Sequence, residues 1–242
     1  VDVGPLYGKV FRLAARRIFN AASLCVVRNT ESASFLNRIG VDRAPVVSVD
    51  SVIAMPVVEP KVPRDTEIAL EEKIVLIHVT KDKKMESYIN HVVKAAADVF
   101  ASPNVRFVVT DDFMLPKNIW LKRAKECLPA DRTILYDYDG MTGLREIIKQ
   151  SDIVITPKLY VAIFASLHNK VIFSFPVHPS KTTRFFKQIN YLEHCHPIES
   201  VDYDFIVKLF QKRADSPARI PDDMKRLAEQ NLSLLDIFLD QL

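Results

Sequence analysis

Polar side chains suited to an anionic ligand follow two apolar segments between residues 151 and 190. The segments, residues 153–155 and 171–175, have strand character, and a helical pattern lies between them. In an open parallel sheet, ligands bind at the carboxyl ends of the strands. The residues at or just after these two ends are Lys158, Tyr160, His178, Ser180, Lys181 and Arg184. Cations at the start of a helix, where backbone N–H groups also attract negative charge, predict a site for an anion that carries phosphate.

Lys158, Tyr160 and the pair Lys181 and Arg184 each allow two interpretations. Lys158 follows Pro157 at a predicted helix start, where it either holds an anion or extends into solvent. Lys181 and Arg184 lie one turn apart, so they either clamp a carboxylate or phosphate or form a solvated helix face. Tyr160 either packs or donates a proton, and a phenol with a pKa of about 10 is a weak general acid unless its surroundings change that value.

Other chemically active residues have simpler structural explanations. His78 lies on a strand that is predicted to be buried. The His-Cys-His run at residues 194–196 lacks the ligand spacing of a tetrahedral zinc site, and we predict no metal. Asp111 and Asp112 follow one predicted strand, and another acidic pair follows the next. These carboxylates either accept hydrogen bonds from sugar hydroxyls or form turns.

The composition excludes several classes of protein. A net charge of +3 without a basic cluster argues against a nucleic-acid partner. Three distant cysteines provide no disulfide framework, and no apolar run reaches the roughly 20 residues of a membrane span. Five glycines among 242 residues cannot form a dinucleotide or Walker phosphate loop. We therefore expect a cytoplasmic protein, with peripheral attachment to a membrane as the alternative, and the sequence does not indicate an oligomeric state.

The order of apolar patterns predicts an α/β fold, a Rossmann-like parallel sheet flanked by helices. Residues 1–58 resemble the second half of a Rossmann-like unit, so we expect only part of an N-terminal domain, and the absence of a starting methionine favours a fragment or processed product. The proline-rich residues 59–67 form the predicted linker. Residues 68–201 are the predicted C-terminal ligand-binding domain, and residues 202–242 are predicted C-terminal helices.

Three short motifs resemble the polysaccharide pyruvyl transferase family. Gly4-Pro5 precedes a basic helix, as in the middle of family members. Residues 27–32, Val-Arg-Asn-Thr-Glu-Ser, followed by Leu36 and by Gly-Val at residues 40–41, are similar to a family pattern that has Arg-Asp at its start. Residues 155–160, Ile-Thr-Pro-Lys-Leu-Tyr, resemble the family's helix start with Arg-Leu-His, and Lys181 matches a lysine in the following turn. The resemblance extends from about residue 4 to residue 190.

The resemblance implies a GT-B-like protein that transfers a pyruvyl group from phosphoenolpyruvate to a sugar of a cell-surface polysaccharide. Phosphoenolpyruvate is then the donor substrate, a sugar or lipid-linked glycan is the acceptor, and no cofactor is expected. Arg28, Lys158, Ser180, Lys181 and Arg184 are implied to bind substrate. Tyr160 occupies the position of the family's histidine, which acts as the catalytic acid. Two alternatives stay open: the nucleotide-sugar half of a GT-B glycosyltransferase, and a non-catalytic domain that binds a glycan or a partner.

Overall fold

The computed structural model describes residue 3 and residues 6–56, 72–112 and 118–239 of the chain. These residues belong to two compact units, and each unit is described by itself. The smaller unit joins residues 1–56 with residues 221–242, and the larger unit is residues 57–220. The predicted linker at residues 59–67 lies outside the described residues.

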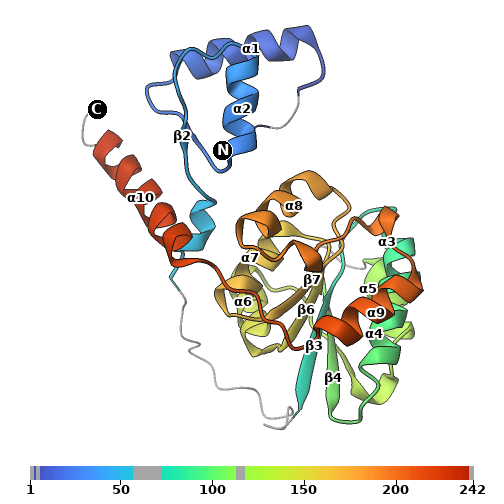
Figure 1. The fold of residues 1–242 in the computed structure, drawn as a ribbon. Coiled ribbons are helices and arrows are strands. Elements are labelled where there is room, and N and C mark those ends of the chain that lie inside the picture. The colour runs from blue at the N-terminus through green and yellow to red at the C-terminus, as the bar shows by residue number, and fades with distance from the viewer. Residues whose placement is uncertain (1–2, 4–5, 57–71, 113–117, 240–242) are drawn as a thin grey trace. The chain divides into compact units, whose positions relative to one another are not determined.

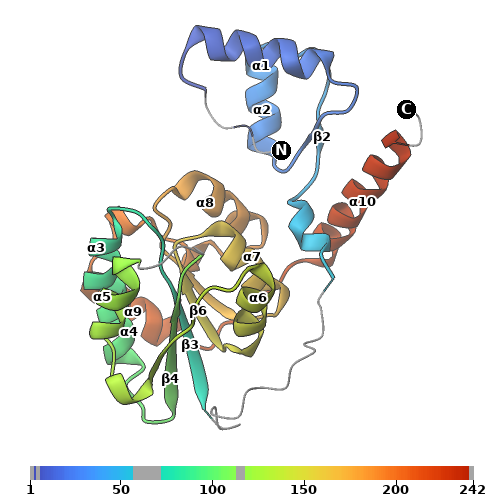
Figure 2. The same ribbon diagram turned by 180° about the vertical axis from the view of Figure 1, so that it is seen from behind.

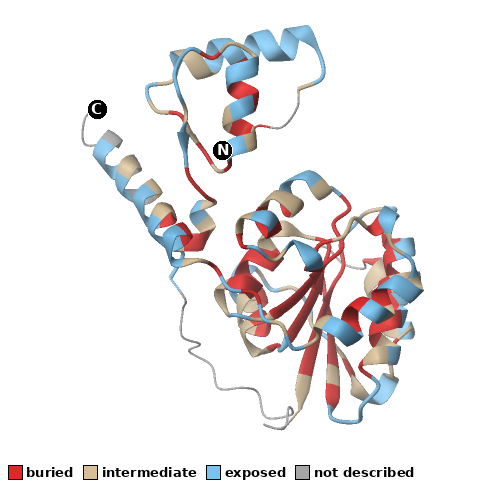
Figure 3. Ribbon diagram, viewed as in Figure 1, coloured by how far each residue is buried: buried red, intermediate tan, exposed pale blue. Residues whose placement is uncertain are grey.

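The larger unit is built on a five-stranded parallel sheet with the order β5-β4-β3-β6-β7 (Figure 1). The strands are β3 (Lys73–His78), β4 (Val105–Thr110), β5 (Thr133–Leu135), β6 (Ile153–Thr156) and β7 (Val171–Ser174). Every residue of β6 and β7 is buried (Figure 3). Strands covered on both faces require continuous apolar runs, which explains why these segments are apolar throughout and do not alternate. The predicted class, α/β with a parallel sheet flanked by helices, is confirmed.

Helices cover both faces of this sheet (Figures 1 and 2). One face carries α3, η2 and α4, which form one continuous helical stretch with π-helical geometry in η2. Helices α5 and α9 lie on the same face, and all of these helices share one hydrophobic core. Helices α6 and α7 lie on the other face, and α8 follows β7. The bounds are α3 (Met85–Ser87), η2 (Tyr88–Val93), α4 (Lys94–Val99), α5 (Ile119–Glu126), η3 (Ala130–Arg132), α6 (Met141–Gln150), α7 (Leu159–Leu167), α8 (Pro179–Gln188), η4 (Leu192–His194), η5 (Ile198–Ser200) and α9 (Tyr203–Arg213).

The direction of the chain across the sheet reverses between β3 and β6. From β3 the chain moves outward to β4 and β5, and it then returns to the other side of β3 to form β6 and β7. Loops that follow neighbouring strands on the two sides of such a reversal diverge, and they leave a crevice at the carboxyl ends of the strands. The loops after β3 and β6 therefore flank the place where a ligand is expected.

The smaller unit contains a two-stranded parallel sheet with helices around it. Its elements are α1 (Lys9–Ala21), β1 (Val26–Val27), α2 (Thr30–Arg38), β2 (Val46–Val47), η1 (Ser51–Ala54) and α10 (Asp222–Leu239). The sequence places the cap of α2 between Thr30 and Ser34, whereas the capping side chain is Asn29, which accepts a hydrogen bond from the Ser32 N–H at 2.8 Å. Gly40, with a φ of 81°, ends this helix in the left-handed conformation that glycine adopts easily.

Helix α1 exposes several of its large apolar side chains. Phe11 is 67% exposed and Ile18 is 66% exposed, and among the described side chains of α1 only Ala15 is buried. The two predicted C-terminal helices belong to different units. Helix α9 packs on α4 in the larger unit, whereas α10 packs on η1 in the smaller one, where Asn231 Nδ2 donates to the Val49 carbonyl at 3.0 Å. None of the described helices is long and apolar enough to cross a membrane.

Candidate functional site

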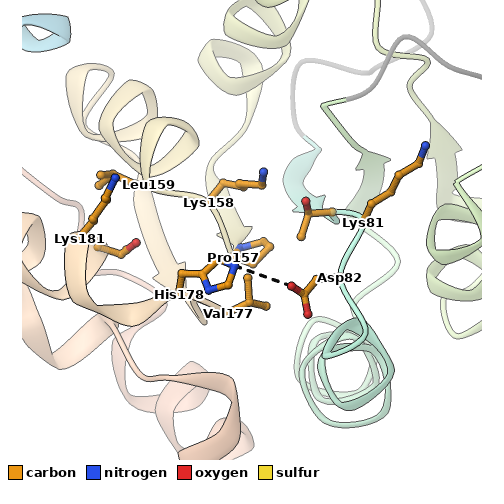
Figure 4. A pocket seen from close by; sticks show the side chains of 10 residues that line it. Lys81, Asp82, Pro157, Lys158, Leu159, Val177, His178 and Lys181 are labelled. Atoms are coloured by element: carbon orange, nitrogen blue, oxygen red, sulfur yellow. Dashed lines mark ion pairs between the residues drawn. The ribbon is translucent and has the colours of Figure 1, made fainter. Parts of the chain in front are cut away.

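A pocket of about 240 Å³ lies at the carboxyl ends of β3, β6 and β7 (Figure 4). Three loops of the larger unit line it, and two of them flank the reversal of the sheet. The lining residues are Thr80, Lys81, Asp82, Pro157, Lys158, Leu159, Val177, His178, Lys181 and Thr182. The location is the one at which open parallel sheets bind their ligands.

Positive charge dominates the described lining of this pocket. Lys81, Lys158 and Lys181 contribute ammonium groups, and Asp82 is the carboxylate among the lining residues. Helices α7 and α8 begin at the pocket, and neither Lys158 nor His178, the residues that precede them, makes a side-chain capping hydrogen bond. Uncapped N–H groups at a helix N-terminus attract anions, and so do the lysines. The pocket therefore suits a ligand with more than one negative group.

Behind the pocket, a set of polar side chains that we call the inner cluster is tied together by Asp112. The cluster consists of His78, Asp112, Thr156, Lys158 and Tyr160. The Tyr160 hydroxyl donates to Asp112 Oδ2 at 2.5 Å, and Lys158 Nζ lies 3.1 Å from the same oxygen. His78 Nε2 lies 3.8 Å from Asp112 Oδ1. One carboxylate at the end of β4 thus positions the first residues of α7.

Burial sets the protonation states of the inner cluster. It lowers the pKa of His78 to about 4; the carboxylate of Asp112 opposes this shift, and Lys158 adds to it. The imidazole is therefore neutral at physiological pH. Burial, together with the hydrogen bond to Asp112, raises the pKa of Tyr160 well above its ordinary value. Its phenol holds its proton firmly and directs it at Asp112.

Elsewhere in the pocket, His178, which precedes α8, faces Asp82 (Figure 4). We call His178, Asp82 and the neighbouring Lys84 the α8 rim. The distance from His178 Nε2 to Asp82 Oδ2 is 3.9 Å, and the His178 side chain is 86% exposed. Asp82 Oδ1 accepts a hydrogen bond from the Lys84 N–H at 2.9 Å, and Lys84 Nζ donates to the Val177 carbonyl at 3.0 Å. The two loops that carry Asp82 and His178 are therefore fastened to each other by Lys84.

The structure brings together some of the residues that the sequence singles out. Lys158 and Lys181 both line the pocket. Ser180 and Arg184 lie on α8 but are not among the described lining residues, and Tyr160 lies in the inner cluster. Arg28 belongs to the smaller unit, where it pairs with Asp50 at 2.6 Å. The substrate-binding roles of these residues and the catalytic role of Tyr160 stay predictions.

Lys81 and Asp82 are pocket residues that the sequence analysis missed, and the role of Asp112 as a shared acceptor was also unforeseen. A signal for the first two exists, because residues 80–82 directly follow a predicted strand. Within the described residues, no group of three or more His, Cys, Asp or Glu side chains could hold a metal ion. His194 instead stacks on Tyr191 with ring centroids 3.8 Å apart.

Solved structures with a similar fold come from enzymes of sugar metabolism. A candidate UDP-N-acetylglucosamine 2-epimerase from Listeria monocytogenes matches with a TM-score of 0.67 and 13% identity, over 91% of this chain and 61% of that one. The S. aureus MnaA–UDP structure matches with a TM-score of 0.62 and 14% identity, over 93% and 62% of the two chains. The likeness shows the fold, which is GT-B-like as expected, and this chain spans about three-fifths of the length of each neighbour.

Sequence comparisons give a more specific result than the fold. None of the curated protein sequences matches this chain. A family profile described as polysaccharide pyruvyl transferase matches residues 3–179. The matched range includes the three pocket loops as far as His178 and the helix start at Pro179.

Proposed function

Because this chain belongs to the polysaccharide pyruvyl transferase family, we propose that its pocket binds phosphoenolpyruvate for transfer of the pyruvyl group to a sugar. The acceptor is a sugar of a polysaccharide or a lipid-linked glycan. The observation that carries this proposal is the gathering of Lys81, Lys158 and Lys181 around one pocket at the reversal of the sheet.

The chemistry of phosphoenolpyruvate matches this distribution of charge. The molecule carries a phosphate and a carboxylate on adjacent parts of a three-carbon skeleton, so its site needs cations from more than one direction. Lys158 approaches from the start of α7, and Lys181 approaches from the first turn of α8. The N-termini of these two helices add their own attraction for the anionic groups. Ser180 and Arg184 lie on the same helix as further proposed substrate contacts.

Isothermal titration calorimetry with phosphoenolpyruvate tests the proposal. Lys158→Ala and Lys181→Ala are each expected to weaken binding about tenfold, because each loses a charge-assisted contact. Lys187→Ala is the matched control, since Lys187 is an exposed lysine near the end of α8 and is not among the described lining residues. No binding by folded wild-type protein, or equal losses in all three variants, would contradict the proposal.

A nucleotide sugar is the second candidate ligand. It is favoured by the similarity of fold to the UDP-bound structure of MnaA, and a diphosphate would also suit helix N-termini flanked by lysines. The same calorimetric series, run with UDP and a UDP-sugar, separates the two ligands. Binding of the nucleotides without binding of phosphoenolpyruvate would favour a glycosyltransferase-like function.

A further inference from the structure

The proposed reaction requires a proton donor beside the bound enolpyruvate. Phosphoenolpyruvate has a CH₂ group at C3, whereas the pyruvyl ketal has a CH₃ group, so one proton must form a new C–H bond with the π electrons of the double bond. The electron-poor C2 then accepts one sugar hydroxyl oxygen, and a second hydroxyl replaces the phosphate. Of the two hydroxyl protons, one replaces the donated proton and the other leaves with inorganic phosphate. The first step needs an acid inside the pocket.

Tyr160 is poorly placed and poorly poised for this step. It is not among the described residues that line the pocket, and its hydroxyl already donates to Asp112. Burial and that hydrogen bond raise the pKa of the phenol, which makes it a weaker acid. An acid that gives up a proton in each turnover also has to take one up again. The Tyr160 phenol is half-buried against the Asp112 carboxylate, so its position does not favour that exchange.

The structure assigns this step to the α8 rim: we infer that His178, faced by Asp82, is the acid that protonates C3 of phosphoenolpyruvate. This inference rests on the proposed function. His178 lines the same pocket as Lys158 and Lys181, on the loop that leads into α8. An imidazole changes its charge near neutral pH, which makes it the most suitable side chain for proton transfer.

The surroundings of His178 support its orientation. Asp82 is a positioning residue: it is fixed by the Lys84 N–H, and its other oxygen lies 3.9 Å from His178 Nε2. The charged groups around the rim are Asp82, Lys81, Lys158, Lys181 and the ion pair of Lys84 with Glu199, whose atoms are 3.1 Å apart.

Exposure of His178 completes the cycle. Its side chain is 86% exposed, so the neutral imidazole can take a new proton from water after each transfer. Lys84 joins the loops of Asp82 and His178 through the Val177 carbonyl, so the pair keeps its arrangement when product leaves. The α8 rim thus combines a fixed carboxylate with a solvent-accessible imidazole.

Deuterium incorporation tests the inference with a simple hydroxyl donor in place of the natural acceptor. The full chain is incubated with phosphoenolpyruvate and methyl glucoside in D₂O, while ¹H NMR follows deuterium at C3 and ³¹P NMR follows inorganic phosphate. His178→Gln is expected to slow deuterium incorporation about 100-fold while changing the dissociation constant of phosphoenolpyruvate by no more than about threefold. Asp82→Asn is expected to slow it about tenfold, because the carboxylate acts through the imidazole.

Two controls make the result decisive. His196→Gln is expected to retain the wild-type rate, and Tyr160→Phe, which tests the rival assignment of the acid, is expected to slow deuterium incorporation far less than His178→Gln. A normal rate in His178→Gln, or a lost rate in Tyr160→Phe, would overturn the inference. Failure of wild-type protein to bind phosphoenolpyruvate, or binding without deuterium incorporation, contradicts the proposed function, whereas incorporation that persists in His178→Gln contradicts only the role of His178.

Discussion

The inner cluster and the α8 rim flank one pocket, but their polar groups are held in opposite ways. In the inner cluster, Asp112 is only 9% exposed and holds both Tyr160 and Lys158. In the α8 rim, His178 is solvent-exposed and faces Asp82 at a distance longer than a hydrogen bond. Similar residue types at two strand ends therefore differ in rigidity: Asp112 fixes the geometry of the inner cluster, and the rim is open to solvent, as the proposed proton transfer requires.

The largest expected difference between the two sides is in stability. Asp112→Ala is expected to lower the free energy of unfolding by about 2 to 3 kcal/mol, because the Tyr160 hydroxyl and the Lys158 ammonium lose their shared acceptor. Asp82→Ala is expected to cost about 1 kcal/mol or less, because its partners are the exposed His178 and one backbone N–H. Urea unfolding measures both values. Equal losses would show that the inner cluster is no more rigidly held than the rim.

Acid is expected to destabilise the inner cluster selectively. The pKa of folded His78 is about 4, below the value of about 6.5 in an unfolded chain, so between these values the unfolded state binds a proton that the folded state does not. The stability contributed by neutral His78 is therefore complete above about pH 6.5 and is lost as the pH falls towards 4. From pH 7 to pH 5 this amounts to about 2 kcal/mol.

Urea unfolding at pH 7 and pH 5 measures this effect. The loss in His78→Gln should be smaller than in wild-type protein by about this amount. Burial also lowers the pKa of His194 to about 4, so part of the acid sensitivity persists in that variant. His178→Gln should keep the full dependence, and a reduced dependence there would place the acid-sensitive group in the rim.

The smallest expected difference comes from single polar atoms. Tyr160→Phe removes one hydroxyl and is expected to cost about 1 kcal/mol, because Asp112 loses a strong donor. His178→Gln is expected to change stability by no more than about 0.5 kcal/mol, because the side chain is exposed. Thermal unfolding in parallel samples compares the two variants. A larger loss in His178→Gln than in Tyr160→Phe would reverse the assignment of a structural side and an exchanging side.

Much of the larger unit could be predicted from the sequence, because its strands are buried on both faces and its helices have regular apolar spacing. The apolar segments at residues 153–155 and 171–175 lie in β6 and β7, as the sequence predicts, apart from Phe175, which directly follows β7. The division of the two C-terminal helices between units could not be predicted, because the pattern of a helix does not identify the surface against which it packs. The choice of Asn29 over Thr30 as a cap depends on one turn of backbone geometry.

The location of the candidate site could also be predicted, because Lys158 and Lys181 follow apolar strands and sheet topology brings strand ends together. The partners of those residues could not. Asp112 and Tyr160 are 48 residues apart, and only the neighbouring positions of β4, β3 and β6 bring them into contact. Spacing along α8 correctly predicts that Lys181 and Arg184 lie near each other, but it does not reveal which of them lines the pocket.

The composition of the smaller unit has a consequence for biosynthesis. Its core and strands come from residues before position 57, whereas α10 comes from residues after position 220. During translation, α10 therefore emerges only after every residue of the larger unit. The smaller unit therefore depends on two segments that are synthesised at different times. Its η1 lacks the contacts with α10, among them the hydrogen bond from Asn231 to the Val49 carbonyl, until the second segment has been made.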